Sequence, residues 1–113
     1  MNRIFLSLII LILSSNLAFG HPPSAINVKY DPAAKEVTAT IAHQVGNPRG
    51  HFIDKVTIKV NQDLPVLQRF SFQRTAKEQI AVFAIPNVKS GDIIVIEANC
   101  NKGGRLSQQV RIE

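Results

Sequence analysis

Short apolar runs that alternate with polar residues constrain this chain more than any other feature of its sequence. Clusters of Gly, Pro, Asn, Asp or Ser separate the runs at intervals of about 8 to 12 residues, which is typical of short strands joined by turns. No stretch shows the helical period of about 3.6 residues. The pattern predicts an all-β fold, an immunoglobulin-like antiparallel β-sandwich of about seven strands. The expected strands cover residues 26–30, 37–43, 51–60, 66–72, 80–84, 93–98 and 106–112.

The start of the chain has the pattern of a secretory signal peptide. Arg3 gives a positive start, residues 4–13 are almost entirely apolar, and the residues just before position 20 are small. The apolar run is too short to span a bilayer. We therefore expect residues 1–20 to be a signal peptide cleaved near Gly20. The mature chain is then periplasmic or secreted, begins at His21 and has no membrane attachment.

The expected mature chain, residues 21–113, is long enough for one domain. It carries 12 Lys and Arg against 8 Asp and Glu, and along the sequence the basic residues are scattered rather than clustered. Nucleic-acid binding is therefore not expected, since it needs a contiguous basic face and usually stacking aromatics. The run 93–98 is apolar apart from one residue, which predicts a central strand buried on both faces.

Cys100 is the single cysteine of the chain. Exported proteins tend to avoid cysteine or to pair it, so a lone cysteine there is a metal ligand, a reactive or intermolecular thiol, or a small buried residue. His43 ends one expected strand and His51 begins the next, so both imidazoles lie at one rim of the sandwich if those strands pair. Two imidazoles and a thiolate suit iron, copper(I) or zinc, and Asn101 is placed to donate hydrogen bonds to the sulfur.

These residues also carry a family resemblance. The run 43–53, followed downstream by Cys100 and Asn101, resembles the ferrous-iron domain of desulfoferrodoxin, the superoxide reductase family. His43 stands at the family's His-Pro pair, and His51 with the next two residues stands at its His-aromatic-Ile segment. The resemblance implies an immunoglobulin-like sandwich whose iron takes four histidines and one axial cysteine. It also implies reduction of superoxide to peroxide at the open sixth position, with electrons from a donor protein.

The sequence departs from the family pattern in ways that bear on activity. Gln44 replaces the proline after the first histidine, and Gly103 stands where the motif Cys-Asn-x-His-Gly has its histidine. His21, followed by two prolines, is the available match to the family's Lys-His-x-Pro segment. The resemblance thus implies a degenerate, exported member with weak or absent superoxide reductase activity. The expected metal is iron, with copper or zinc as alternatives. The expected metal ligands are His21, His43, His51 and Cys100.

Two other families share parts of this pattern. A histidine-aromatic-isoleucine segment leading a strand also resembles the sulfur-compound chelating subunit of the periplasmic thiosulfate-oxidising system, a non-catalytic scaffold that pairs with a carrier protein. His21 as a new N-terminus before a sandwich resembles periplasmic copper-binding proteins, in which the terminal amine and an imidazole hold copper with another histidine. The alternatives to an enzyme are therefore a scaffold and a copper-binding protein.

Three expectations about the site follow. His43, His51 and Cys100 should cluster at one end of the sandwich, because each lies at the end of an expected strand. His21 should be mobile unless a metal recruits it, since chain termini seldom order without a tether. Lys102 and a neighbouring arginine flank the turn after Cys100 and would attract a small anion such as superoxide.

Overall fold

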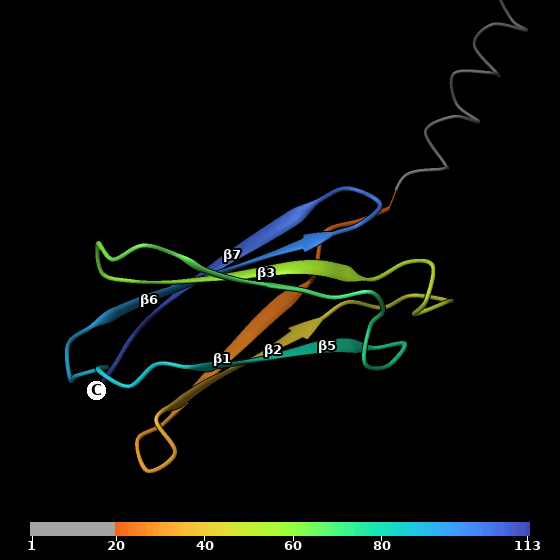
Figure 1. Ribbon diagram of the computed structural model, residues 1–113. Coiled ribbons are helices and arrows are strands. Elements are labelled where there is room, and N and C mark those ends of the chain that lie inside the picture. The colour runs from red at the N-terminus through yellow and green to blue at the C-terminus, as the bar shows by residue number, and fades with distance from the viewer. Residues whose placement is uncertain (1–19) are drawn as a thin grey trace, which may run out of the picture.

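The computed structural model describes residues 20–113 of the chain, and residues 1–19, which make up the predicted signal peptide apart from Gly20, lie outside the described part. Seven strands form two antiparallel sheets that pack face to face, as Figure 1 shows. The predicted all-β sandwich is confirmed, and residues 20–113 contain no helix. The strands are β1 (Ala25–Asp31), β2 (Glu36–Ala42), β3 (Ile53–Val60), β4 (Val66–Arg69), β5 (Glu78–Ala84), β6 (Ile93–Cys100) and β7 (Arg105–Arg111).

The order of the strands is immunoglobulin-like. One sheet has the order β1-β2-β5 and the other the order β4-β3-β6-β7. Tight connections join β1 to β2, β3 to β4 and β6 to β7 within a sheet, whereas the chain crosses between the sheets after β2, β4 and β5. In the described part of the chain, no helix is long and apolar enough to cross a membrane.

The core lies between the two sheets and follows the alternation of the sequence. In β2, Val37, Ala39 and Ile41 are fully buried while the residues between them face outward. Burying these aliphatic side chains, at about 25 cal/mol per Å² of apolar surface, is the main force that holds the sheets together. The other buried apolar side chains are Ile26, Val45, Ile53, Val56, Ile58, Ala81, Phe83, Ile94, Ile96, Ala98 and Cys100.

Strand β6 differs from its prediction in one respect. It is central in its sheet, between β3 and β7, but its burial alternates residue by residue. Its even-numbered residues from Ile94 to Cys100 point into the core, and its odd-numbered residues are half-buried on the outer face. The prediction of burial on both faces was wrong because a two-layer sandwich leaves the outer face of each sheet uncovered.

Strand β3 begins two residues later than predicted and contains a bulge. The register with β6 shifts between Ile53 and Lys55, so that Ile53 and Val56 both face the core although they are three residues apart. His51 therefore lies in the turn before the strand rather than in it. A bulge admits one extra residue and re-aims the side chains on either side of it.

The two ends of the sandwich are built differently. The histidine end is formed by residues 20–24, 43–52, 70–77 and 101–104, and the turn end by residues 32–35, 61–65 and 85–92 with the C-terminus. Figure 1 shows the C-terminus at the turn end, and the entering chain at the histidine end. The predicted site residues His43, His51 and Cys100 all lie at the histidine end, as expected.

Candidate metal centre

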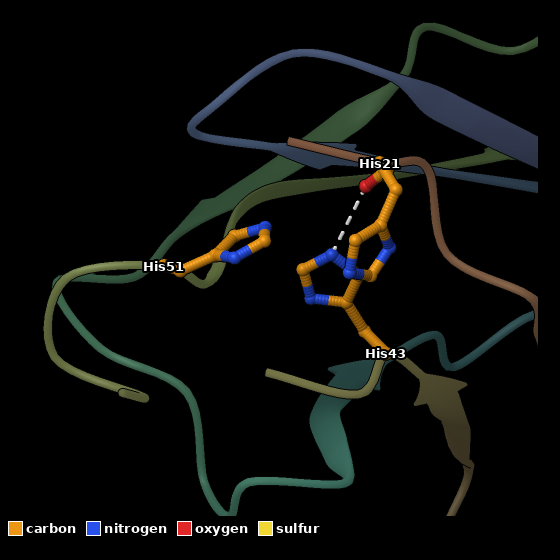
Figure 2. Close-up of side chains that lie close together, drawn as sticks. All are labelled: His21, His43 and His51. Atoms are coloured by element: carbon orange, nitrogen blue, oxygen red, sulfur yellow. Dashed lines mark hydrogen bonds between the residues drawn. The ribbon is translucent and has the colours of Figure 1, made fainter. Parts of the chain in front are cut away.

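The chain has three histidines, and the structure brings all of them together. Each offers one ring nitrogen, and these three nitrogens all lie within 4.8 Å of one another. The ring centroids are 4.6 Å apart for His21 and His43, 5.0 Å for His21 and His51, and 4.9 Å for His43 and His51. Figure 2 shows the three imidazoles converging from separate segments of the chain. These three side chains are the histidine cluster.

The histidines meet across the sandwich rather than along one sheet. His43 directly follows β2 and His51 precedes β3, but β2 pairs with β1 and β5 while β3 pairs with β4 and β6. The two imidazoles therefore do not share a rim through strand pairing. His43 continues the inward face of β2, and the loop between the strands carries the chain to the other sheet and returns His51 toward the same point.

Gln73 fixes the proton on His43. Both side chains are buried, with 1% of their surface exposed. The amide nitrogen of Gln73 donates to the carbonyl oxygens of His43 (2.7 Å) and Thr75 (3.0 Å), so its oxygen must be the acceptor, and Ile53 N–H donates to that oxygen at 3.2 Å. His43 Nδ1 lies 2.8 Å from the same oxygen and must therefore carry a proton. In the neutral ring, Nε2 is left with a free lone pair, directed at the histidine cluster.

His21 is tethered through its ring and through the residue that follows it. Its Nε2 lies 2.9 Å from the carbonyl oxygen of Gln44 and donates to it, which leaves the Nδ1 lone pair free in a neutral ring. A β-carbon on Gly104 would lie 2.6 Å from Pro22 N, so only glycine lets the two segments approach this closely. Gly104 also has a φ of +96°, which favours glycine. The expectation of a mobile His21 does not describe this arrangement.

When the His43 and His21 rings are neutral, two close approaches in the histidine cluster pair an acceptor with an acceptor. His43 Nε2 lies 3.1 Å from the carbonyl oxygen of His21, and His21 Nδ1 lies 3.1 Å from that of Pro22. Neutral imidazole has a single N–H, which in each ring is already donated elsewhere. A lone pair and a carbonyl oxygen then face one another, and a cation bound beside them would stabilise both.

His51 presents a buried nitrogen with no partner. Its Nε2 is buried and makes no hydrogen bond, which normally costs stability. Burial lowers the pKa of His51, and the nearby charges of His43, His21 and Lys102 lower it further. The lowered pKa favours the neutral ring, which carries one lone pair, and a metal requires neutral imidazole.

Asn101 positions the loop that carries His51. Its amide nitrogen donates to the carbonyl oxygen of Gly50 at 3.1 Å, and its amide oxygen accepts from Phe52 N–H at 2.9 Å. Its backbone N–H donates to the carbonyl oxygen of Phe52 at 2.9 Å. The expectation that Asn101 donates to the sulfur was therefore wrong, because its donors are used on this loop. The N–H of Lys102 lies 3.4 Å from Cys100 Sγ instead.

Cys100 lies beside the histidine cluster but outside it. It is a free, buried cysteine at the end of β6, opposite Ile53. A β-carbon built on Gly20 would lie 3.3 Å from Cys100 Sγ and 3.1 Å from His51 Nε2, so both donor atoms face the space that Gly20 occupies. The group whose donor atoms all lie within 4.8 Å consists of the histidines alone.

Gly103, which the sequence resemblance aligned with a histidine of the Cys-Asn-x-His-Gly motif, has a turn conformation. Its φ is +108°, and a β-carbon on it would meet nothing within 4 Å. Its N–H donates to the carbonyl oxygen of Cys100 at 3.0 Å, which closes the turn between β6 and β7. Lys102 and Arg105 on either side are exposed.

The residue that sequence reasoning missed is Gln73. It lies between β4 and β5, in a segment outside the expected strands, and is almost completely buried. A lone glutamine after two alternating phenylalanines carries no signal that distinguishes it from a surface residue. Its role depends on the meeting of three segments that are far apart in the sequence.

Comparisons with known proteins add a weak likeness of shape. No family model matches the sequence, and no curated protein matches it. A solved structure titled superoxide reductase (neelaredoxin) from Ignicoccus hospitalis has a TM-score of 0.46 and 12% identity, covering 80% of this chain and 82% of that one. A variant of the same protein has a TM-score of 0.47 and 14% identity, covering 87% and 85%. Similarity at this level assigns neither a family nor an activity to the chain.

Proposed function

We propose that this protein binds one transition-metal ion through His21, His43 and His51. The observation that carries the proposal is the convergence of every histidine of the chain, with one buried ring nitrogen that has no other partner. The second-sphere contacts support it, because ligand histidines usually donate their other N–H to a backbone or side-chain oxygen. His43 does so to Gln73, and His21 does so to Gln44.

Three neutral imidazoles select among the metals. Imidazole suits iron, copper, zinc and nickel, whereas magnesium and calcium prefer oxygen ligands. The resemblance of the sequence to desulfoferrodoxin favours iron, with Cys100 as an additional ligand after a small shift of the chain around Gly20. A bound iron would supply one-electron chemistry, and the histidine cluster would hold it beside the exposed cation of Lys102.

Superoxide reductase activity is proposed to be weak or absent. The position of the fourth histidine is occupied by Gly103, and no other histidine remains in the sequence to replace it. Loss of an imidazole ligand changes both the geometry and the reduction potential of an iron site. The role proposed for this chain is therefore metal binding rather than rapid turnover of superoxide.

Copper binding at a processed N-terminus is the second candidate, and the position of His21 favours it. The imidazole of His21 lies in the histidine cluster, so cleavage after Gly20 would place a new α-amine next to that cluster. An amine and two or three imidazoles form a nitrogen-rich set that suits Cu(II). This candidate depends on cleavage of the predicted signal peptide.

Metal titration of the processed protein tests both candidates. The full-length gene is expressed with its own leader, without a tag, and the N-terminus is established by mass spectrometry. Affinities for Fe(II), Cu(II) and Zn(II) are measured by anaerobic competition with chelators. We expect one equivalent of metal to bind. Loss of a second-sphere partner lowers metal affinity about 10- to 100-fold, and His51→Ala should lower it further because it removes a ligand.

Two variants and one spectrum complete the test. Thr38→Ala, on the outer face of β2, is the control and should leave the affinity unchanged. Loading with Co(II) shows whether Cys100 is a ligand, because a bound thiolate gives a thiolate-to-metal absorption band. We expect this band in the unmodified protein and its loss in Cys100→Ser. Absence of stoichiometric binding by the unmodified protein would contradict the proposal and favour the non-catalytic scaffold.

A further inference from the structure

Most of the basic residues that lie in strands share one surface of the fold, although they are scattered along the sequence. The outward-facing positions of β3, β4, β6 and β7 form the outer face of the four-stranded sheet. Glu97 and, in the bulge of β3, Asp54 are the carboxylates among the positions of these strands that do not face the core. The lysines and arginines among them are Lys55, Lys59, Arg69, Arg105 and Arg111. This surface is called the basic face below.

Part of the basic face is a row of like charges across the sheet. Arg69 is the register partner of Lys55, Lys55 that of Asn99, and Asn99 that of Arg105. Side chains opposite one another on adjacent strands lie close together, and like charges in such positions repel. The buried Oδ1 of Asn99 makes no hydrogen bond. The row therefore sets three cations against one nearby carboxylate, Asp54, and an opposite charge from outside would complement it.

On the outer face of the other sheet, carboxylates outnumber cations. The outward positions of β1, β2 and β5 carry Lys29 as their cation. Their carboxylates are Asp31, Glu36 and Glu78. Among the strand residues, positive charge is thus concentrated on one side of the sandwich, and a field of this kind orients an approaching partner and speeds its association.

The centre of the basic face is apolar and slightly hollowed. Leu67 is 46% exposed, and a shallow hollow of about 180 Å³ beside it is lined by Thr57, Lys59, Pro65, Val95 and Glu97. Protein interfaces have this anatomy, with an apolar centre surrounded by a polar or charged rim. A surface for nucleic acid would instead present stacking aromatic side chains, and no outward position of these four strands has one.

We propose that the basic face is the docking surface for a protein partner with an acidic patch. The apolar centre and the central carboxylate of Glu97 favour a protein over an anionic membrane, which would attract a purely cationic surface. The charged row lies next to the histidine end, because Asn99 directly precedes Cys100 in β6. A docked partner would therefore lie close to the histidine cluster, although docking does not require a metal to be bound there.

Binding to defined anionic probes tests the electrostatic part of this proposal. The processed protein is isotope-labelled and titrated with a short oligoglutamate peptide. We expect NMR shift changes at Thr57 and Val95, and none at Thr40 on the other sheet. Lys55→Glu/Arg105→Glu should weaken the binding by about tenfold, because it reverses charges within the row. The control variant Lys29→Glu/Lys35→Glu has the same net charge as Lys55→Glu/Arg105→Glu. It should bind the peptide with an affinity within about twofold of that of the unmodified protein.

In-cell cross-linking tests for the partner itself. A photo-reactive amino acid replaces Thr57 on the basic face or, as the matched control, Thr38 on β2. We expect an adduct with a protein from position 57 only, and the purified partner should lose affinity with added salt and with Lys55→Glu/Arg105→Glu. Absence of an adduct from position 57, or binding that ignores the charge reversal, would overturn the proposal. Charge-dependent binding to phosphatidylglycerol vesicles without a protein adduct would favour a membrane instead.

Discussion

At the turn end of the sandwich, polar side chains satisfy turn backbone or one another, whereas at the histidine end a buried ring nitrogen is left without a partner. Asp31 Oδ1 accepts the N–H groups of Ala33 and Ala34 within the β1–β2 turn. At the histidine end, Gln73 instead bridges segments that are far apart in the sequence, and His51 Nε2 is left without a partner.

The difference distinguishes polar side chains that stabilise the fold from polar side chains that are available to bind a ligand. A side chain that closes a turn has its hydrogen bonds complete and needs nothing more from outside. A buried nitrogen with no partner costs about 1 to 3 kcal/mol, and a fold retains such a cost where a ligand or a proton offsets it. The histidine end is therefore where changes should affect binding, and the turn end is where they should affect stability alone.

The largest effect that sharpens this comparison is expected at Gln73. Gln73→Leu leaves His43 Nδ1, the N–H of Ile53 and a buried carbonyl group without partners. We expect a loss of about 3 kcal/mol or more in the free energy of unfolding, measured with urea. We also expect metal affinity to fall about 10- to 100-fold, because the proton on His43 is no longer fixed.

A second buried glutamine provides the control. The amide of Gln79 donates to the carbonyl oxygens of Ile53 and Phe72 but does not contact a histidine. Gln79→Leu should reduce stability by a similar amount and leave metal affinity within about twofold. Gln73→Glu retains an acceptor for His43 and should recover metal affinity without recovering stability. Equal losses of affinity in both leucine variants would show that Gln73 acts through stability alone.

An intermediate effect is expected at Gly103. Its φ of +108° is strained for any residue with a side chain, so Gly103→Ala and Gly103→His should each cost about 1 to 3 kcal/mol of stability. The new β-carbon would meet nothing within 4 Å, so no residue of the cluster lies against it. Metal affinity should therefore be the same in the two variants. Tighter binding by Gly103→His would mean that the turn can bring a fourth imidazole to the metal.

The smallest effect belongs to the turn end. The amide of Asn61 donates to Asp92 Oδ1 and the N–H of Lys89 donates to Oδ2, and these bonds lower the pKa of Asp92 below its ordinary value of 3.8. A carboxyl group whose pKa is lower in the folded state stabilises the fold above its unfolded pKa. The contribution is lost as the pH falls through the folded pKa.

The measurement compares Asp92→Ala with the unmodified protein. The unmodified protein should have the higher urea midpoint at pH 7, and the difference should shrink as the pH falls below about 3.8. Metal affinity at pH 7 should be the same for both proteins. A change in metal affinity would break the distinction between the two ends.

The fold was largely predictable because alternation is a local signal. The inward positions of β2 and β6 follow from the sequence alone, and His43 and Cys100 continue the inward faces of those strands as expected. The bulge in β3 was not predicted, since Ile53 and Val56 share a face only after the register shifts. The burial of β6 was overestimated because its sequence does not show how many layers cover the sheet.

The candidate site was predictable in its residue types and less so in its geometry. His43 and His51 were expected to meet through strand pairing, but they meet across the two sheets. His21 was expected to be mobile, because its contacts with Gln44 and with Gly104 depend on the packing of three segments. The cations of the basic face were likewise hidden, since strand register and not sequence distance brings Lys55 and Arg105 into one row, with Asn99 between them.

The close approach at Gly20 makes the residue tolerated at position 20 depend on whether the chain is cleaved after it. A β-carbon there would lie 2.3 Å from the β-carbon of Lys102, which no side chain tolerates without displacing the turn. Where the peptide bond after residue 20 remains intact, substitution of this glycine is therefore excluded by packing. Where that bond is cut, packing places no demand on residue 20, and the peptidase alone decides what is tolerated. Natural variation at this single position would thus distinguish a retained leader from a removed one.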